Sequence, residues 1–226
     1  SSDVCSSDLI PAKSSTNKAD KNPLLLAAMQ KYWQIIKAVD GAKGALLRIH
    51  LLTGALRPRQ LLRLTHRQRL PDRIVLLDIK GKRSVGKPYA TPLIKQVVRD
   101  MRVFANNREF VFSLDGGKTA IRHETLSMWA KAVVGSQIED FLLKRVRSGV
   151  ETLLASKRIS KDVRGQLQSH GIGGVQDKNY DAHDYMPEKL EALQTLFDVL
   201  GKRITLRELA SNRRCQKRED RQGNYI

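Results

Sequence analysis

The sequence predicts a mostly α-helical fold that carries one small antiparallel β-sheet. Apolar residues recur over most of the chain at the three- and four-residue spacing of a helix face. Two strand-like runs, at 73–79 and 87–93, flank a segment of glycines and basic residues that suits a hairpin loop. Hydrophobic residues make up 41% of the 226 residues, which is enough for one folded core. The class is therefore α+β with helices predominating.

Three helices are expected before the hairpin. The first, at 24–39, places its apolar residues near one face: Leu24, Leu25, Met29, Trp33, Ile36 and Val39. The second, at 44–54, is apolar and ends at Gly54. The third is short, at 57–64, and Pro58 occupies its first turn, where a missing N–H does no harm.

Helices also dominate the part of the chain after the hairpin. Periodicity predicts them at 93–105, 123–135, 137–157, 159–171 and 187–201. A strand that ends in a turn is expected at 108–117.

Three segments organise the chain. Residues 1–22 are rich in Ser, Asp and Asn, lack apolar periodicity and predict a disordered leader. The first nine residues resemble translated sequencing-adapter sequence, so we expect this leader to be artefactual and the natural protein to be longer. One domain spans 23–200, and 201–226 form a basic carboxy-terminal tail.

The charge of the chain indicates a polyanionic partner. Lys and Arg total 41 against 23 Asp and Glu, a net charge of +18 that is spread along the sequence. Aromatic residues are only 5%, which disfavours base stacking on single strands or RNA and favours duplex DNA. The sequence has no membrane-spanning run and no signal-peptide pattern, and Cys5 and Cys215 lack metal-ligand neighbours. We expect a cytoplasmic, nucleoid-associated protein without a membrane partner.

The most informative residues are a tyrosine, a histidine and two arginines. Tyr180 follows His170 by ten residues, and Arg57 and Arg147 stand upstream. Attack of a phenol on a phosphodiester needs cations for the non-bridging oxygens and groups that accept and donate protons. Motifs of other chemistries are absent from the sequence: it has no Lys-Ser phosphate loop, no HExxH and no serine nucleophile elbow. The pattern therefore favours phosphoryl transfer with a tyrosine nucleophile.

Four segments of this chain resemble the catalytic domain of the tyrosine recombinases, the phage-type integrases. They are TGALRPRQLLRL, DIKGKRSVGKPYATPL, KRVRSGVETLLA and SHGIGGVQDKNY, and the likeness covers roughly 24–200. Two positions depart from the family's pattern. Gln60 stands where the first box usually has Glu, and Lys144 replaces the His of the second.

The resemblance implies a role for each residue. Tyr180 would attack DNA to give a 3′-phosphotyrosyl link and a free 5′-hydroxyl. Arg57 and Arg147 would hold the scissile phosphate, Lys80 would protonate the leaving oxygen, and His170 would bind the phosphate or assist proton movement. No cofactor or metal is implied, because the covalent link conserves the phosphodiester energy. The family also implies a homo-multimer, a tetramer, on duplex DNA, for integration or excision of a mobile element.

Several assignments have alternatives. Lys82 competes with Lys80, and Lys82, Arg83 and Lys87 are expected to bind backbone phosphates. Tyr185 competes with Tyr180 but lies farther from His170 than the family's usual gap.

Two other functions also remain open. One is a non-catalytic or decayed DNA-binding protein of the same fold, which Lys144 and Gln60 favour. The other is a type IB topoisomerase. A covalent adduct separates the catalytic hypotheses from the non-catalytic one, and strand exchange separates a recombinase from a topoisomerase.

Overall fold

The computed structural model describes residues 22–78, 87–169 and 183–202. Its first part holds α1 (Leu26–Lys37), α2 (Gly41–Leu52), α3 (Pro58–Leu61), the 3-10 helix η1 (His66–Gln68), β1 (Arg73–Asp78) and β2 (Lys87–Pro92). Its second part holds α4 (Lys95–Met101), the 3-10 helix η2 (Arg102–Phe104), α5 (His123–Val134), α6 (Leu143–Ser156), α7 (Lys161–Gln168) and α9 (Met186–Gly201). Among these residues the fold is mostly helical with one two-stranded sheet, which confirms the predicted class.

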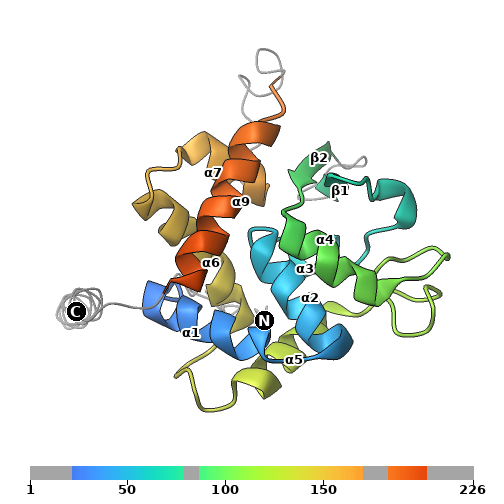
Figure 1. Cartoon of the computed structure of the whole chain (residues 1–226), viewed down its shortest axis with the longest axis horizontal. Helices are drawn as coiled ribbons and strands as arrows, with labels where there is room; N and C mark the ends of the chain where they lie inside the picture. Colours follow the sequence, from blue (N-terminus) through green and yellow to red (C-terminus); the bar gives the residue numbers. More distant parts are fainter. Residues whose placement is uncertain (1–21, 79–86, 170–182, 203–226) are drawn as a thin grey trace, which may run out of the picture.

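The helices form two groups that meet in one core. Figure 1 shows α6, α7 and α9 together on one side, with α2, α3, α4 and the β-hairpin on the other. Helix α1 contacts α2 in one group and α6 and α9 in the other. An ion pair fixes α2 to α4, because Arg48 Nη2 lies 3.0 Å from Asp100 Oδ1. The largest fully buried side chains include Met29, Tyr32, Ile36, Leu46, Leu47, Ile49, Leu51, Leu52, Leu56, Leu61 and Phe112.

Local sequence explains where several helices begin, end and touch. The hydroxyl of Ser160 accepts a hydrogen bond from the N–H of Val163 and caps the start of α7. Helix α7 ends at Gln168, and Ser169 after it has the left-handed conformation with φ +54°. Gly149 lets α6 approach the chain before α1 closely, since a Cβ there would lie 2.5 Å from the carbonyl oxygen of Leu24.

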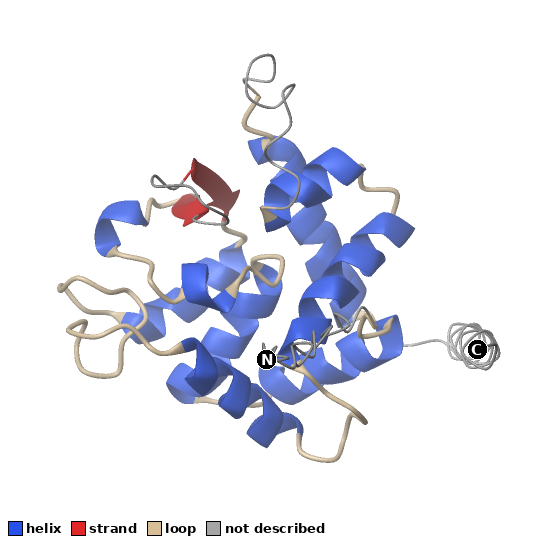
Figure 2. Ribbon diagram, turned by 180° about the vertical axis from the view of Figure 1, so that it is seen from behind, coloured by secondary structure: helices blue, strands red, loops and turns tan. Residues whose placement is uncertain are grey.

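The hairpin presents one face to the core. Strands β1 and β2 pair antiparallel, with Ile74 opposite Thr91 and Leu76 opposite Tyr89. All four of these side chains are buried, as the two-residue period of a half-covered strand requires. Figure 2 shows the two strands at the edge of the helical body.

Two of the expected elements are wrong in type or extent. The segment 108–117 is not a strand, since only Phe110 joins an isolated bridge, to Thr65. The carboxylate of Asp115 instead accepts from two following backbone N–H groups and holds a turn. The helix expected at 137–157 begins only at Leu143. The chain before it is broken by Asp140, whose φ of +49° no right-handed helix accommodates.

The other predicted helices are present with shifts of a few residues at their ends. The predicted leader, apart from Asn22, and most of the predicted tail lie outside the described residues. None of the described helices is long and apolar enough to cross a membrane.

Candidate functional site

Arg57 and Arg147 come from distant parts of the chain and meet at the end of α7. Arg57 precedes the first turn of α3, and its Nη2 donates to the carbonyl of Ser169 at 3.2 Å. Arg147 lies in α6, and its Nη2 donates to the carbonyl of Gln168. The two guanidinium groups therefore hold consecutive carbonyls, directly before the position of His170.

Arg147 is a half-buried cation. Its Nη1 donates to the carbonyl of Ala55 at 2.9 Å. Burial, and after it the positive charge of Arg57, lower the pKa of its guanidinium to about 10. Two like charges at a partly buried place repel each other, so an anion that contacts both is favoured there.

A sharp turn supplies the carbonyl that holds Arg147. Gly54 and Ala55 both have positive φ, at +84° and +51°, where α2 has just ended. Position 54 needs glycine for two reasons. Its φ is positive, and a Cβ there would lie 3.0 Å from the side chain of Leu167. The turn brings the carbonyl of Ala55 to the guanidinium and leads directly into the segment that carries Arg57.

A polar network joins this pair to the hairpin. The carboxylate oxygen Oδ1 of Asp78 lies 3.3 Å from Arg57 Nη1 and accepts from Gln60 Nε2 at 3.0 Å. The hydroxyl of Tyr89 donates to Gln60 Oε1 at 3.0 Å. Burial raises the pKa of the Tyr89 phenol, so this group stays a neutral donor. Gln60 therefore bridges a carboxylate and a phenol rather than facing solvent alone.

Three residues of this site were missed by reasoning from the sequence: Asp78, Tyr89 and Gln168. For Asp78 a signal existed, because it is a polar residue at a buried position that ends an apolar strand. For Tyr89 the signal was its place on the buried face of β2. For Gln168 it was a polar side chain at an apolar position of α7, next to the buried Leu167.

Only part of the predicted set can be located. Lys144 is exposed at the start of α6, about one turn before Arg147. Lys87 opens β2 opposite Asp78, and only its backbone position is described. The others lie outside the described residues: Lys80, Lys82, Arg83, His170 and Tyr180. Their roles stay predictions.

The rival tyrosine, Tyr185, does lie among the described residues. It is half-buried against the core at the start of α9, with φ +53°. Its ring contacts that of His183, with centroids 4.7 Å apart. These contacts pack the ring of Tyr185, and the choice between Tyr180 and Tyr185 as the nucleophile stays a prediction.

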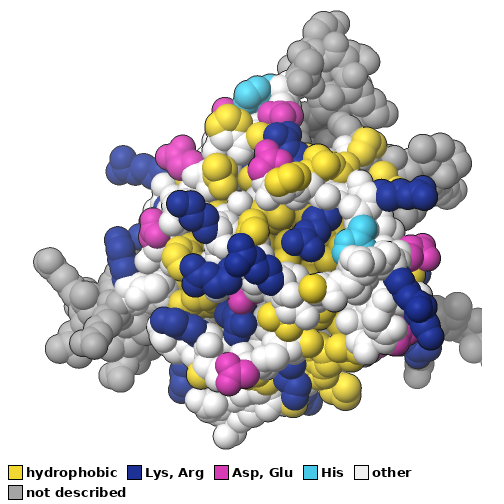
Figure 3. Space-filling view, turned by 45° about the vertical axis from the view of Figure 1, so that its right-hand side comes forward, with side chains coloured by type: hydrophobic (Ala, Val, Ile, Leu, Met, Phe, Trp, Pro, Cys, Tyr) yellow, Lys and Arg dark blue, Asp and Glu magenta, His cyan; other side chains and the backbone are white. Residues whose placement is uncertain are grey.

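Basic side chains spread over the surface as well. Figure 3 shows Lys and Arg side chains across one face, with Asp and Glu side chains scattered among them. Three arginines are exposed: Arg59 in α3, Arg63 just after it and Arg67 in η1. Among the described residues, no group of three His, Cys, Asp or Glu lies together as metal ligands would.

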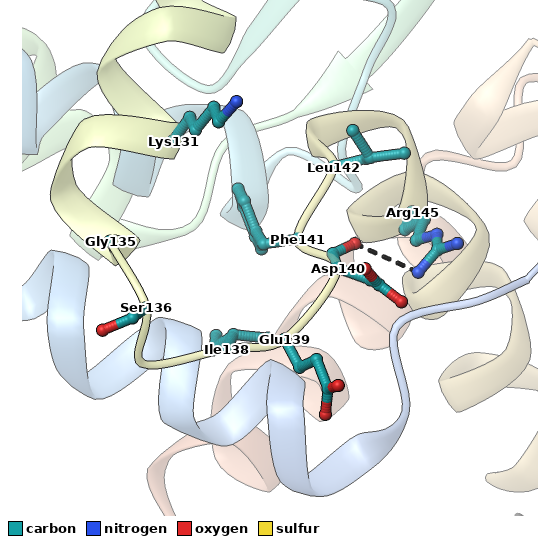
Figure 4. Close-up of a pocket in the computed structure, with 9 residues that line it drawn as sticks. All are labelled: Lys131, Gly135, Ser136, Ile138, Glu139, Asp140, Phe141, Leu142 and Arg145. Atoms are coloured by element: carbon teal, nitrogen blue, oxygen red, sulfur yellow. Dashed lines mark hydrogen bonds between the residues drawn. The ribbon is translucent and has the colours of Figure 1, made fainter.

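A separate cavity of about 770 Å³ lies between α5 and α6. Within it, Arg145 Nη1 donates to the carbonyl of Asp140 at 3.0 Å (Figure 4). Neither Arg57 nor Arg147 lines it. The lining residues are Lys131, Gly135, Ser136, Ile138, Glu139, Asp140, Phe141, Leu142 and Arg145.

Comparison with known proteins gives a fold but no sequence relative. No protein-family model matches the chain, and no curated protein matches it. Among solved structures, an integrase from mycobacterium phage Brujita is similar with a TM-score of 0.58 and 19% identity, over 84% of this chain and 62% of the integrase. The XerA recombinase is similar with a TM-score of 0.50 and 15% identity, over 81% of this chain and 67% of that one. This chain thus spans less than two thirds of the integrase's length, and it has the fold of the tyrosine recombinase catalytic domain.

Proposed function

We propose that this chain is the catalytic domain of a site-specific recombinase that cleaves and rejoins duplex DNA through Tyr180. One observation carries the proposal. Arg57 and Arg147 converge on the end of α7, within two residues of His170, in a fold shared with an integrase and a recombinase. Two guanidinium groups that lie together suit a phosphate whose charge grows during attack.

The reaction balances without an external energy source. The phenolic oxygen of Tyr180 attacks phosphorus, and the bond from phosphorus to the 5′-oxygen breaks. Lys80 gives its proton to that oxygen, while the proton of Tyr180 leaves to a base, for which His170 is the candidate. The product is a 3′-phosphotyrosyl link, and attack by a 5′-hydroxyl of a partner duplex reverses each step.

The arginine pair supplies the electrostatic part of this mechanism. Arg147 is held by two backbone carbonyls, so its guanidinium is oriented before a phosphate arrives. Its lowered pKa reflects burial first and then the positive charge of Arg57. Asp78 provides only partial compensation to Arg57, at 3.3 Å. A phosphodiester between the two cations would complete the charge balance and gain more as negative charge develops on it.

The partner in this proposal is duplex DNA, and the working unit is a multimer, a tetramer. The net charge of +18 supports a polyanionic partner. Lys82, Arg83 and Lys87 at the hairpin are proposed to contact backbone phosphates.

A non-catalytic DNA-binding protein is the second candidate, and two residues favour it. Lys144 stands exposed on α6 where the family has His, and an ammonium exchanges protons poorly at neutral pH. Gln60, in place of an acid, leaves Asp78 as the one carboxylate bonded to Arg57 in the described chain. In the recombinase proposal Lys144 donates to a phosphate oxygen instead of moving a proton.

Covalent capture of DNA decides between these two functions. The protein is incubated in EDTA with a supercoiled plasmid pool that carries random inserts, because its target sequence is unknown, and the reaction is stopped with SDS. We expect protein-linked nicked DNA from the natural chain and from Tyr185→Phe, and none from Tyr180→Phe, which still binds DNA. Binding of DNA without any adduct would overturn the recombinase proposal and leave the non-catalytic one.

A further inference from the structure

Gln168 is a buried polar residue that touches both arginine segments. It is the last residue of α7 and only 1% exposed. Its Nε2 donates to the carbonyl of Gly54 at 2.9 Å and to that of Arg147 at 3.0 Å. Its own carbonyl accepts from the Arg147 guanidinium. Gln168 and Arg147 therefore bind each other twice, each through its side chain to the other's backbone.

The orientation of the Gln168 amide follows from its neighbours. Both groups that face Nε2 are carbonyl oxygens, which accept but cannot donate, so the nitrogen must point toward them. The other amide atom, Oε1, is buried and has no hydrogen-bond partner in the described chain. An unsatisfied buried oxygen is unfavourable, and the two hydrogen bonds that Nε2 donates offset part of that cost.

The two carbonyls belong to the segments that position the cations. Gly54 begins the left-handed turn that presents the Ala55 carbonyl to Arg147 and leads to Arg57. The other carbonyl is that of Arg147 itself. One amide at the end of α7, just before the position of His170, therefore contacts two other segments. One is the turn after α2 that leads to Arg57, and the other is the helix α6 that carries Arg147.

We propose that Gln168 is a positioning residue that sets the separation of the Arg57 and Arg147 guanidinium groups so that both face one phosphate. It acts through its contacts with Gly54 and Arg147 and touches no substrate itself. The inference rests on the proposed function of this site. The inference adds to the site a residue whose side chain is neither charged nor reactive.

The chain offers a matched control in Gln30 on α1. Gln30 is 4% exposed, and its Nε2 donates to the carbonyls of Val199 and Lys202 at 2.8 and 3.2 Å. Its Oε1 also lacks a partner in the described chain. Gln30→Met and Gln168→Met thus remove the same two donors and keep nearly the same side-chain length. None of the partners of Gln30 is an arginine-site residue.

The test compares covalent cleavage of a normal phosphodiester with cleavage of a methylphosphonate at the scissile position. The substrate sequence is recovered from adducts of the natural protein. A methyl group in place of one non-bridging oxygen removes the charge that paired guanidinium groups stabilise. We expect Gln168→Met to cleave the phosphodiester about 100-fold more slowly, the effect of a misplacement of about 1 Å. On the methylphosphonate its rate relative to the natural protein recovers at least about tenfold, because fewer cations are needed.

A purely structural role predicts another pattern. A variant that only lowers the folded fraction loses the same factor on both substrates, and we expect this of Gln30→Met. Equal losses for Gln168→Met on the two substrates would overturn the positioning role while leaving the proposed function intact.

A second readout does not depend on activity. The Nε–H signal of Arg147 in a ¹⁵N NMR spectrum is assigned by its absence in Arg147→Lys. We expect Gln168→Met to shift or broaden it and Gln30→Met to leave it in place. If the natural protein forms no adduct on either substrate, the proposed function fails. The Arg147 signal then decides the inference, and an unchanged signal in Gln168→Met overturns it.

Discussion

An anion that binds at the arginine pair should stabilise the fold, and Arg147 sets the size of this effect. Burial first, and then the charge of Arg57, lower the Arg147 pKa from 12.5 to about 10 in the folded protein. At roughly 1.36 kcal/mol per pKa unit, the charged Arg147 costs the folded state up to about 3 kcal/mol. The charge destabilises the fold, because the folded state holds this proton less tightly than the unfolded state. The cost is fully present at neutral pH and begins to fall only above about pH 10, where the folded state loses this proton before the unfolded state does.

The experiment is a titration with inorganic phosphate at neutral pH and constant ionic strength, followed by thermal unfolding. A bound anion that offsets this cost adds up to about 3 kcal/mol to the free energy of unfolding. For a chain of this size that is a ceiling of about 6 to 12 °C in Tm. Arg147→Met should lose most of the phosphate-dependent rise.

The matched control is Arg145→Met, two residues away on α6. Arg145 donates to the carbonyl of Asp140 and takes no part in the arginine pair. This variant should keep the full rise in Tm. A phosphate-dependent rise in Arg147→Met equal to that of the natural protein would refute the reasoning, because the anion would then bind elsewhere.

Three further predictions concern charge, packing and pH. Asp78→Asn keeps the acceptor for Arg57 but removes a negative charge beside the proposed phosphate, so duplex DNA should bind up to about tenfold more tightly by fluorescence anisotropy; weaker binding would contradict this. Gly149→Ala places a Cβ 2.5 Å from the Leu24 carbonyl oxygen. The cost of overpacking, about 1–3 kcal/mol, should outweigh the gain of about 1 kcal/mol in helix propensity. The urea midpoint of unfolding should therefore fall, not rise. Burial, and after it the charge of Arg147, lower the His50 pKa from 6.5 to about 4. The unfolded state therefore takes up the proton first as the pH drops. The free energy of unfolding should fall by up to about 3 kcal/mol between pH 6.5 and pH 4. His50→Met should flatten that dependence, and an unchanged slope would show that other groups cause it.

Local pattern was enough for much of the fold. The spacing of buried residues such as Met29, Trp33 and Ile36 predicted α1, and two strand-like runs on either side of a segment of glycines and basic residues predicted the hairpin. It failed at 137–142, where Ile138 and Phe141 are buried at helix-like spacing but pack as a loop. Periodicity reports which residues are buried and not the backbone that buries them.

The candidate site, like the fold, could be predicted only in part from the sequence. Order and context singled out Arg57 and Arg147, because cations before a histidine and a tyrosine have a chemical meaning. The contacts of Asp78, Tyr89 and Gln168 join segments far apart in the chain, so only tertiary structure reveals them. Polar residues at buried positions were the available signal, and such positions are worth examining in any basic chain of this type.

The central claim is that Tyr180 becomes covalently joined to DNA. Trypsin cleaves after Lys178 and Lys189, so one peptide, 179–189, contains both Tyr180 and Tyr185, and mass-spectrometric fragmentation separates the two. The account predicts a nucleotide on Tyr180, joined through a 3′-phosphate, and a free 5′-hydroxyl on the other DNA end that a kinase can label. DNA on Tyr185, a 5′-phosphate link, or an adduct that survives in Tyr180→Phe would contradict it.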